Sequence, residues 1–361
     1  MTLLSSFFLS CLFYDLLMKK LLLSFLLVFS IGSLFAQRNS QPSIEVLTQG
    51  TNASLRGLSV VNNNIIWVSG NNGTIGRSSN GGKDWKWMQV KGFENKDFRD
   101  IEAFDATTAI IMSVDTPAYI LKTVDGGETW KLVYENRTPG MFLDAMEFWN
   151  EQAGIVVGDP VNGRFFVART FDGGNTWKEI PEDRRPIAHT GEACFAASGT
   201  NVRRLDTDEA VFISGGLRSR VFIRDQAIDL PIIQGKESTG ANSIAVYDNF
   251  KRNGGQQMIV VGGDFTADSS TRQNCFFSNN RGKTWRASRV PPTGYRSCVE
   301  YLSKKQLIAC GLNGVDYSYD GGNTWKRISN LGFHVCRIAK LGNTVYLAGA
   351  NGRVARLILP G

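Results

Sequence analysis

Apolar residues in this chain gather in short runs that are separated by polar and glycine-containing turns. Each run holds five or six residues, is rich in β-branched and aromatic side chains, and usually ends near a glycine. This is the pattern of a buried β-strand. It predicts an all-β chain of seven repeated units. The seven runs are Ile65–Gly70, Ala109–Val114, Gly154–Gly158, Ala210–Gly215, Met258–Gly262, Gln306–Gly311 and Thr344–Gly349.

An eight-residue motif recurs between these runs. Its clearest copy is SYDGGNTW at Ser318–Trp325, and Thr123–Trp130 and Thr170–Trp177 are close copies, whereas Ser78–Trp85 and Ser278–Trp285 are looser. Asp or Asn followed by Gly suits a tight hairpin, and the closing Trp brings a large apolar ring to pack between sheets. The alternative is that the carboxylates catalyse a reaction. Five repeated copies would be an unusual way to build one active site, so we interpret the motif as turn and core.

The spacing of the motif indicates a closed array of blades. The tryptophans that end the five copies are spaced 45, 47, 108 and 40 residues apart, so the long interval covers two periods and one copy has decayed. Units of this length with several short strands match the blades of a β-propeller. The last unit ends without an outer strand, and Ser43–Gln49 resembles the strand that follows each tryptophan. We predict a seven-bladed β-propeller, closed by this N-terminal outer strand, as one domain over residues 37–361.

The first 36 residues are expected to lie outside this domain. Met18-Lys19-Lys20 is followed by an apolar run, Leu21–Phe29, and by a stretch of small residues that ends at Ala36. This is the pattern of a secretory signal peptide cleaved before Gln37, with residues 1–17 as an extension. An uncleaved membrane anchor is the alternative. We therefore expect an exported protein, periplasmic or extracellular, with no membrane span after cleavage.

Composition and charge limit the classes of partner and cofactor that this chain is expected to bind. The formal charge of +7 and pI near 9.1 suit an anionic partner surface. The charges are scattered, without a run of Lys and Arg such as a nucleic-acid-binding arm would have, so no nucleic acid partner is expected. The sequence has neither a GxGxxG motif nor metal-ligand spacing, so no cofactor or metal is predicted. The five cysteines after the leader include no CxxC pair, and we interpret them as small buried strand residues: Cys194, Cys275, Cys298, Cys310 and Cys336.

The strand that opens each unit supplies the candidate site, because the first strand of a propeller blade lines the central channel. Blade seven neighbours blade one, so arginines and a histidine from blades six, seven, one and two are expected to form one cationic arc, with Glu192 roughly opposite. The alternative is that the arginines pair with nearby carboxylates, such as Asp100, Asp144 or Glu192, and only fill the channel. The predicted ring positions, in blade order, are Arg56, Arg99, Leu143, Glu192, Ala241, Arg296 and His334.

The repeated motif resembles the Asp-box, or BNR, repeat of sialidases, sortilin-type receptors, some glucan hydrolases and photosystem II stability/assembly-factor-like propellers. The motif is specific for the blade and weak evidence for activity. Seven blades and few insertions make the chain most similar to the assembly-factor-like family over roughly Ser43–Ile358. That resemblance implies an exported, non-catalytic protein-binding or assembly scaffold with an arginine patch, which would fall at Arg56, Arg99 and Arg296. We expect a monomer that binds a protein partner through an anionic segment; nothing in the sequence points to photosynthesis itself.

A sialidase-like or other glycoside hydrolase is the main alternative. Resemblance to sialidases would require three arginines around a substrate carboxylate, a Tyr/Glu nucleophile pair and an Asp acid. Arg56, Arg99 and Arg296 would supply the arginines, and Glu192 with Asp144 the carboxylates. Against this, no Arg-Ile-Pro precedes the first motif, the blade count is seven, and no tyrosine is clearly placed beside a glutamate. We therefore predict no catalytic residues, and the question of enzymatic activity stays open.

Overall fold

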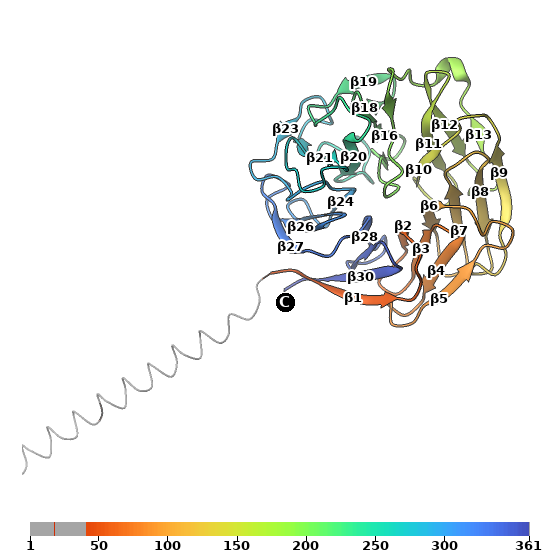
Figure 1. The fold of residues 1–361 in the computed structure, drawn as a ribbon, viewed down its shortest axis with the longest axis horizontal. Coiled ribbons are helices and arrows are strands. Elements are labelled where there is room, and N and C mark those ends of the chain that lie inside the picture. The colour runs from red at the N-terminus through yellow and green to blue at the C-terminus, as the bar shows by residue number, and fades with distance from the viewer. Residues whose placement is uncertain (1–17, 19–40, 361) are drawn as a thin grey trace, which may run out of the picture. The chain divides into compact units, whose positions relative to one another are not determined.

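Seven antiparallel sheets, six of four strands and one of six strands, succeed one another around a common centre (Figure 1). This computed structural model describes Met18 and residues 41–360, and residues 43–358 form one compact unit. The predicted signal peptide lies outside the described residues, apart from Met18. Within the described part of the chain, no helix is long and apolar enough to cross a membrane.

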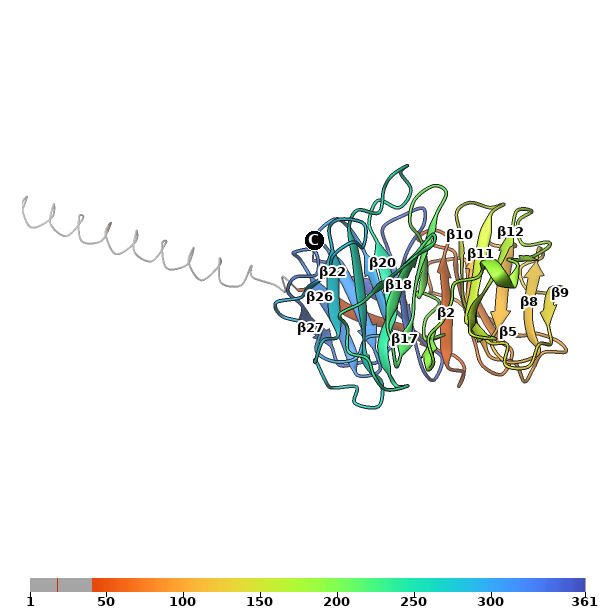
Figure 2. The ribbon, with the colours of Figure 1, turned by 90° about the horizontal axis from the view of Figure 1, so that it is seen from above.

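Each blade is a meander in which successive strands pair through short turns, from an inner strand beside the channel to an outer strand at the rim. Figure 2 shows the strands running along the ring axis. Blades one to three are β2 (Leu55–Val60), β3 (Ile66–Gly70), β4 (Thr74–Ser78) and β5 (Lys86–Gln89); β6 (Phe98–Ala103), β7 (Ala109–Ser113), β8 (Ala118–Thr123) and β9 (Lys131–Asn136); and β10 (Leu143–Phe148), β11 (Gly154–Val161), β12 (Arg164–Thr170) and β13 (Lys178–Glu179).

Blades four to seven continue the same order. They are β15 (Val202–Arg204), β16 (Ala210–Ile213), β18 (Arg220–Ile223) and β19 (Gln226–Asp229); β20 (Thr239–Val246), β21 (Met258–Asp264), β22 (Cys275–Ser278) and β23 (Arg286–Ala287); β24 (Cys298–Tyr301), β25 (Leu307–Gly311), β26 (Gly314–Ser318) and β27 (Lys326–Ser329); and β28 (Val335–Ile338), β29 (Val345–Ala348), β30 (Arg353–Ile358) and β1 (Ser43–Gln49).

The N-terminal strand closes the ring, which confirms the predicted seven-bladed fold. β1 pairs antiparallel with β30 in a register that runs from Ser43 opposite Ile358 to Gln49 opposite Arg353. The first and last strands of the propeller therefore share one sheet, and no edge of blade seven is left without an outer strand.

The Asp-box hydrogen bonds show how the motif shapes each hairpin. In the second blade, the Thr123 hydroxyl donates to the Asp125 carboxylate at 2.8 Å and accepts the Gly127 N–H at 3.0 Å. Asp125 also accepts the Thr129 N–H at 3.0 Å and the Thr129 hydroxyl, and the Trp130 indole N–H donates to the Gly127 carbonyl. The Thr129 hydrogen bonds are the largest cause of lowering the pKa of Asp125 to about 2. The side chains of Thr123, Asp125, Thr129 and Trp130 therefore all bond within the turn.

Blade four departs from the predicted layout. Its inner strand is β15, and the predicted opening strand around Glu192 instead forms β14 (Glu192–Ala193), which pairs with β17 (Gly215–Gly216). Both short strands extend the sheet of blade five. The inserted residues between β13 and β15 carry no hydrophobic alternation, so the sequence period alone placed the inner strand about ten residues too early.

Candidate functional site

A segment inserted before blade four fills the centre of the ring. This plug segment, residues 194–201, is buried except for Phe195. The Ser198 hydroxyl donates to the Ser297 carbonyl at 2.7 Å, and the Thr200 hydroxyl donates to the Ser243 hydroxyl at 2.6 Å. The Arg337 guanidinium donates to the Gly199 carbonyl at 3.1 Å. The plug is therefore bonded to blades five, six and seven.

Gly199 is the point of closest approach between the plug and the wall. Its φ is +63°, and a Cβ atom there would lie 2.3 Å from a carboxylate oxygen of Asp100. Asp100 in turn accepts the backbone N–H groups of Met146 and Ile101 at 2.8 and 2.9 Å. Only glycine fits between blade two and the plug, because any side chain would displace this carboxylate.

Arg56 and Arg99 lie together at the end of the channel where the inner strands begin. Each is the extra residue of a β-bulge, between Leu55 and Gly57 in blade one and between Phe98 and Asp100 in blade two. Both side chains are half-buried. Burial is the first cause that lowers the pKa of the Arg56 guanidinium, and the charge of Arg99 is the second. The structure thus places Arg56 and Arg99 at the same level of neighbouring inner strands.

His334 joins them from blade seven. Its Nε2 lies 3.1 Å from the Ser54 hydroxyl, and its ring is 6% exposed. Burial, followed by the charges of Arg56 and Arg99, lowers the pKa of His334 to about 3. The imidazole is therefore neutral at physiological pH, and it adds a hydrogen-bonding group to the arc instead of a third positive charge.

The two arginines differ in how well their charges are compensated. Arg99 donates to Asp97 at 2.7 Å and lies over the Phe142 ring at 5.8 Å. Arg56 makes one long hydrogen bond, 3.4 Å, to the Ala197 carbonyl of the plug. Among residues 41–360, no carboxylate lies within ion-pair distance of Arg56. Arg56 is thus the group at this mouth that is best placed to accept an anionic partner.

The predicted ring positions in blades three and five, Leu143 and Ala241, are each one residue too early. The bulges of blades three and five fall on Asp144 and Asn242, as shown by the register shifts between Leu143 and Ala145 and between Ala241 and Ser243. The bulge adds one residue to the strand, and its place is not visible in the hydrophobic pattern.

The mouth therefore contains polar groups that sequence analysis did not assign to it. Asp144 is fully buried, and burial followed by the nearby Asp159 raises its pKa. Asn242 accepts the Tyr295 hydroxyl at 2.7 Å. Tyr295 also acts electrostatically on Arg56, which places its phenol near this mouth. Aligning the opening strands by sequence could not have identified Asp144 and Asn242 as ring positions, because the location of each β-bulge must be known first.

Arg296 does not belong to the arc. Its backbone N–H donates to the Gly262 carbonyl, as the Leu55 N–H does to Gly349, so Arg296 occupies the level of Leu55 and not that of Arg56. Its side chain is 0% exposed and points along its own blade to Asp316, with Nε 2.7 Å from the carboxylate. Arg296 thus fits the alternative in which an arginine pairs with a carboxylate. Its partner is Asp316, and not Asp100, Asp144 or Glu192 as considered from the sequence.

All three guanidinium nitrogens of Arg296 have acceptors in blade six or in the segment that leads into it. Arg296 also donates to the Tyr295 carbonyl at 2.7 Å, to Asn313 Oδ1 at 2.8 Å and to Thr293 Oγ1 at 3.0 Å. A guanidinium held in this way has no free donor for a partner. The three arginines that a sialidase-like site requires are consequently not brought together.

Glu192 is also absent from the ring level at which it was expected. Its carboxylate is buried and forms a bidentate pair with Arg220, with Nε 2.8 Å and Nη2 2.5 Å from the two oxygens. It further accepts the Ser214 hydroxyl and the His189 N–H. This closed network fixes β14 against blade four and leaves Glu192 no role opposite the arginines.

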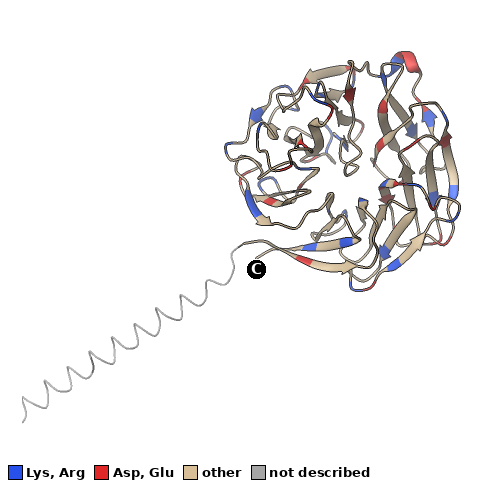
Figure 3. Cartoon of the chain, viewed as in Figure 1, with Lys and Arg blue, Asp and Glu red and all other residues tan. Residues whose placement is uncertain are grey.

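The other end of the channel holds a cavity of about 490 Å³ lined by the later residues of the inner strands. Some of its charged residues form ion pairs, whereas Asp100, Glu151 and Arg204 have no ion-pair partner among the described residues. Arg203 bonds to Glu300 at 2.5 Å, and Lys340 bonds to Glu102 at 2.5 Å. Over the whole unit the basic and acidic residues are likewise interspersed (Figure 3). The Arg56 mouth therefore contains a half-buried guanidinium with no carboxylate within ion-pair distance among residues 41–360, and not a large basic patch.

A closed seven-bladed ring with Asp-box hairpins and a plugged, polar channel defines an Asp-box propeller. Residues 36–354 match the profile of the family described as Photosynthesis system II assembly factor YCF48, and the chain belongs to this family.

Solved structures share the fold at low identity. A structure titled "YCF48 bound to D1 peptide" is 16% identical with a TM-score of 0.62, over 90% of this chain and 96% of that one. YCF48 from Cyanidioschyzon merolae is 18% identical with a TM-score of 0.59, over 87% and 98%. The WD40 propeller domain of Doa1 is 12% identical with a TM-score of 0.60, over 89% and 98%. No curated protein sequence matches this chain.

Proposed function

We propose that this protein is an exported, non-catalytic scaffold that binds an anionic segment of another protein at the Arg56 mouth of the ring. Membership of the assembly-factor family supports a protein-binding role, and the solved YCF48 structure with a D1 peptide supports a peptide as the partner. The single observation that carries the site is the half-buried Arg56 guanidinium, which has no carboxylate within ion-pair distance among residues 41–360.

The chemistry of the mouth favours a carboxylate as the recognised group. A guanidinium presents two parallel N–H donors to a carboxylate, and such charge-assisted bonds contribute about 1.5–3 kcal/mol each. Arg56 is partly removed from water before binding, so part of its desolvation cost is already met by the fold. The neutral His334 ring and the Tyr295 phenol supply uncharged neighbours that would contact the rest of the segment.

Export to the periplasm or the extracellular space is part of the same proposal and rests on the N-terminal sequence. We propose a monomer because closed blades leave no unpaired sheet edge at blade seven for a second copy to extend. The protein would thus present one ring end to its partner as an isolated module.

The proposal is tested by capture from the protein's own cell envelope, comparing wild type with Arg56→Ala/Arg99→Ala. A matched control is Arg137→Ala/Arg286→Ala, which removes the same charge from exposed residues at the rim. Captured proteins are identified by mass spectrometry, and their acidic segments are synthesised for titration. We expect binding at least tenfold weaker for the channel variant and unchanged for the control.

Equal affinity of the channel variant and wild type for the same segment would overturn the site. Affinity should also fall as salt is raised, since a partly exposed ion pair is screened. Hydrolysis of a sialoside or glucan substrate by the wild-type protein would overturn the non-catalytic role and restore the glycosidase alternative.

A further inference from the structure

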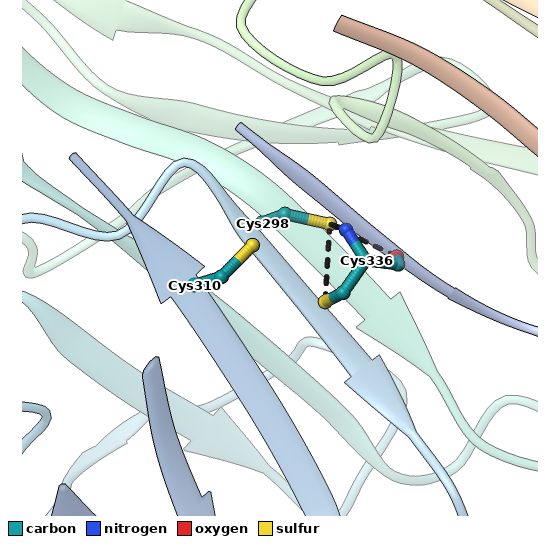
Figure 4. Close-up of side chains that lie close together, drawn as sticks. All are labelled: Cys298, Cys310 and Cys336. Atoms are coloured by element: carbon teal, nitrogen blue, oxygen red, sulfur yellow. Dashed lines mark hydrogen bonds between the residues drawn. The ribbon is translucent and has the colours of Figure 1, made fainter. Parts of the chain in front are cut away.

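Three cysteines from two neighbouring blades point their sulfur atoms at one another (Figure 4). They are Cys298 on β24, Cys310 on β25 and Cys336 on β28, and their Sγ atoms all lie within 4.8 Å of one another. The Sγ atoms of Cys298 and Cys336 are 3.7 Å apart. All three residues are 0% exposed and none is in a disulfide.

The spacing of the sulfurs fits a single thiolate-bound metal ion. A metal–sulfur bond is about 2.3 Å long, so three sulfurs around one ion lie roughly 4 Å from each other. The Cys298–Cys336 separation of 3.7 Å is close to this value, and the other two separations are no longer than 4.8 Å. Cys298 and Cys310 face each other across a strand pair, and Cys336 is held by the adjoining blade, so the three positions are fixed by the sheets.

The Cys298 sulfur is surrounded by three donors and one acceptor, the Cys336 carbonyl oxygen at 3.3 Å, to which its S–H donates when the thiol is protonated. Its Sγ accepts the Cys336 backbone N–H at 3.4 Å, and the Thr200 hydroxyl lies 3.8 Å away. The Arg337 guanidinium lies 3.9 Å from the same sulfur and supplies an opposite charge. Donors of this kind orient metal ligands and compensate their charge in a buried site.

The other two buried cysteines, Cys194 and Cys275, lie outside the cluster and provide an internal comparison. Cys275 accepts the Ser288 hydroxyl at 3.1 Å, and Cys194 donates to the Ile213 carbonyl. Among the described residues, neither belongs to a group of close metal-ligating side chains. A small apolar side chain such as Ala or Val would fill any of these positions, so packing does not account for three sulfurs converging on one point.

We propose that Cys298, Cys310 and Cys336 bind one soft d10 metal ion, Cu(I) in preference to Zn(II). Thiolate sulfur is the ligand type that selects such ions. Cu(I) is satisfied by three sulfurs, whereas structural Zn(II) takes four ligands and this cluster offers three. Binding would release the thiol protons that the ligands carry and would join blades six and seven beside the plug.

The test uses the full-length chain, expressed so that any export and processing take place, and purified without oxygen. Because the cysteines are fully buried, the protein is unfolded in urea and refolded with Cu(I) supplied as its bicinchoninate complex, or with Zn(II). Retained metal is counted after desalting. We expect about one Cu(I) per chain for wild type and at least a tenfold loss for Cys310→Ser. Cys275→Ser, a buried cysteine outside the cluster, should retain the ion.

A second measurement needs no variant and covers the case in which Cys310→Ser fails to fold. Alkylation in mild urea, read by mass spectrometry, should slow at least tenfold at the three clustered cysteines when Cu(I) is bound, and stay unchanged at Cys194 and Cys275. Failure of wild type to retain Cu(I) overturns the proposal, as does equal retention by folded Cys310→Ser. Retention of Zn(II) without Cu(I), or a Cys298–Cys336 disulfide in the protein isolated from cells, also overturns it.

Discussion

Arg296 and Asp316 form the most enclosed ion pair of the propeller, with both side chains 0% exposed. Removing one member of a buried pair leaves the other charge without its partner, which costs about 3–5 kcal/mol. We expect Arg296→Ala to lower the free energy of urea unfolding by this amount. Arg356→Ala, which removes an arginine from a partly exposed pair with Glu45, should cost less than about 1 kcal/mol. Similar losses for both variants would contradict the assignment of Arg296 as a structural residue.

His334 should make the native state sensitive to acid. Its pKa is about 3 in the folded protein, whereas an unfolded histidine has a pKa of about 6.5. Between these values the unfolded chain binds a proton that the native state does not. The free energy of unfolding therefore falls as pH falls through this range, by at most about 1.4 kcal/mol per pH unit.

The contribution of His334 is isolated by comparing wild type with His334→Gln, which keeps a hydrogen-bonding group beside Ser54. Burial raises the pKa of Asp159 to about 6, and this carboxyl acts with the opposite sign in the same range. It is present in both proteins and cancels in the difference. Below pH 6 the variant should gain stability relative to wild type with each unit of acidification. Parallel curves of unfolding free energy against pH would contradict a buried neutral imidazole.

At the scale of the element, the plug depends on a glycine. Gly199→Ala would place a methyl group against the Asp100 carboxylate, and Gly163→Ala provides a control at a similar positive φ with no atom within 4 Å. Both variants share the backbone strain of a left-handed residue, so their difference reports the clash alone. We expect Gly199→Ala to be less stable than the control by about 1–3 kcal/mol, as for overpacked core sites.

Amide hydrogen exchange should show where in the structure Gly199→Ala causes the loss of stability. The amides around Thr200 and Ser198 should exchange faster in Gly199→Ala, because the bonds from the plug to blades five and six would be weakened. If both glycine variants lose the same stability and the plug amides keep their protection, the plug is not tightly packed in the channel.

The elements themselves were largely predictable, and the candidate site was predictable only in part. The run of apolar residues and the Asp-box turns are local signals, and they placed seven blades and the closing strand correctly. The ring position of each side chain depends on β-bulges, which insert one residue without changing the hydrophobic pattern. In blades one and two the bulge falls on the predicted ring positions, Arg56 and Arg99. In blades three and five it falls one residue later, on Asp144 and Asn242.

Blade four shows a second limit. Its box has decayed, and the residues before it form the plug instead of an inner strand, so no repeat signal marks where the blade begins. Convergence of Cys298, Cys310 and Cys336 is equally invisible along the chain, because the three residues lie on different strands of two blades. Contacts across the ring are tertiary, and neither spacing nor composition encodes them locally.

For the whole molecule, β1 is the element on which closure depends. Its Ile44 and Leu47 pack against the core cluster that joins blades six, seven and one, and its backbone covers β30. Deleting residues 43–49 from the full chain should remove roughly 2–4 kcal/mol of apolar burial from these two side chains. It should also expose the edge of blade seven, which favours association between copies. We expect a lower thermal midpoint and concentration-dependent oligomers.

Adding the missing strand as a separate peptide should restore ring closure in the variant that lacks residues 43–49. A synthetic peptide spanning Gln41–Gly50 should add back the outer strand and raise the thermal midpoint with the logarithm of its concentration once that exceeds the dissociation constant. Light scattering should then show a monomer. The same peptide with Leu47→Asp serves as the control, because it keeps the backbone donors but places a charge against the core. If the deleted chain is monomeric and as stable as wild type, the ring is held by the interfaces between blades, and β1 is only an appended strand.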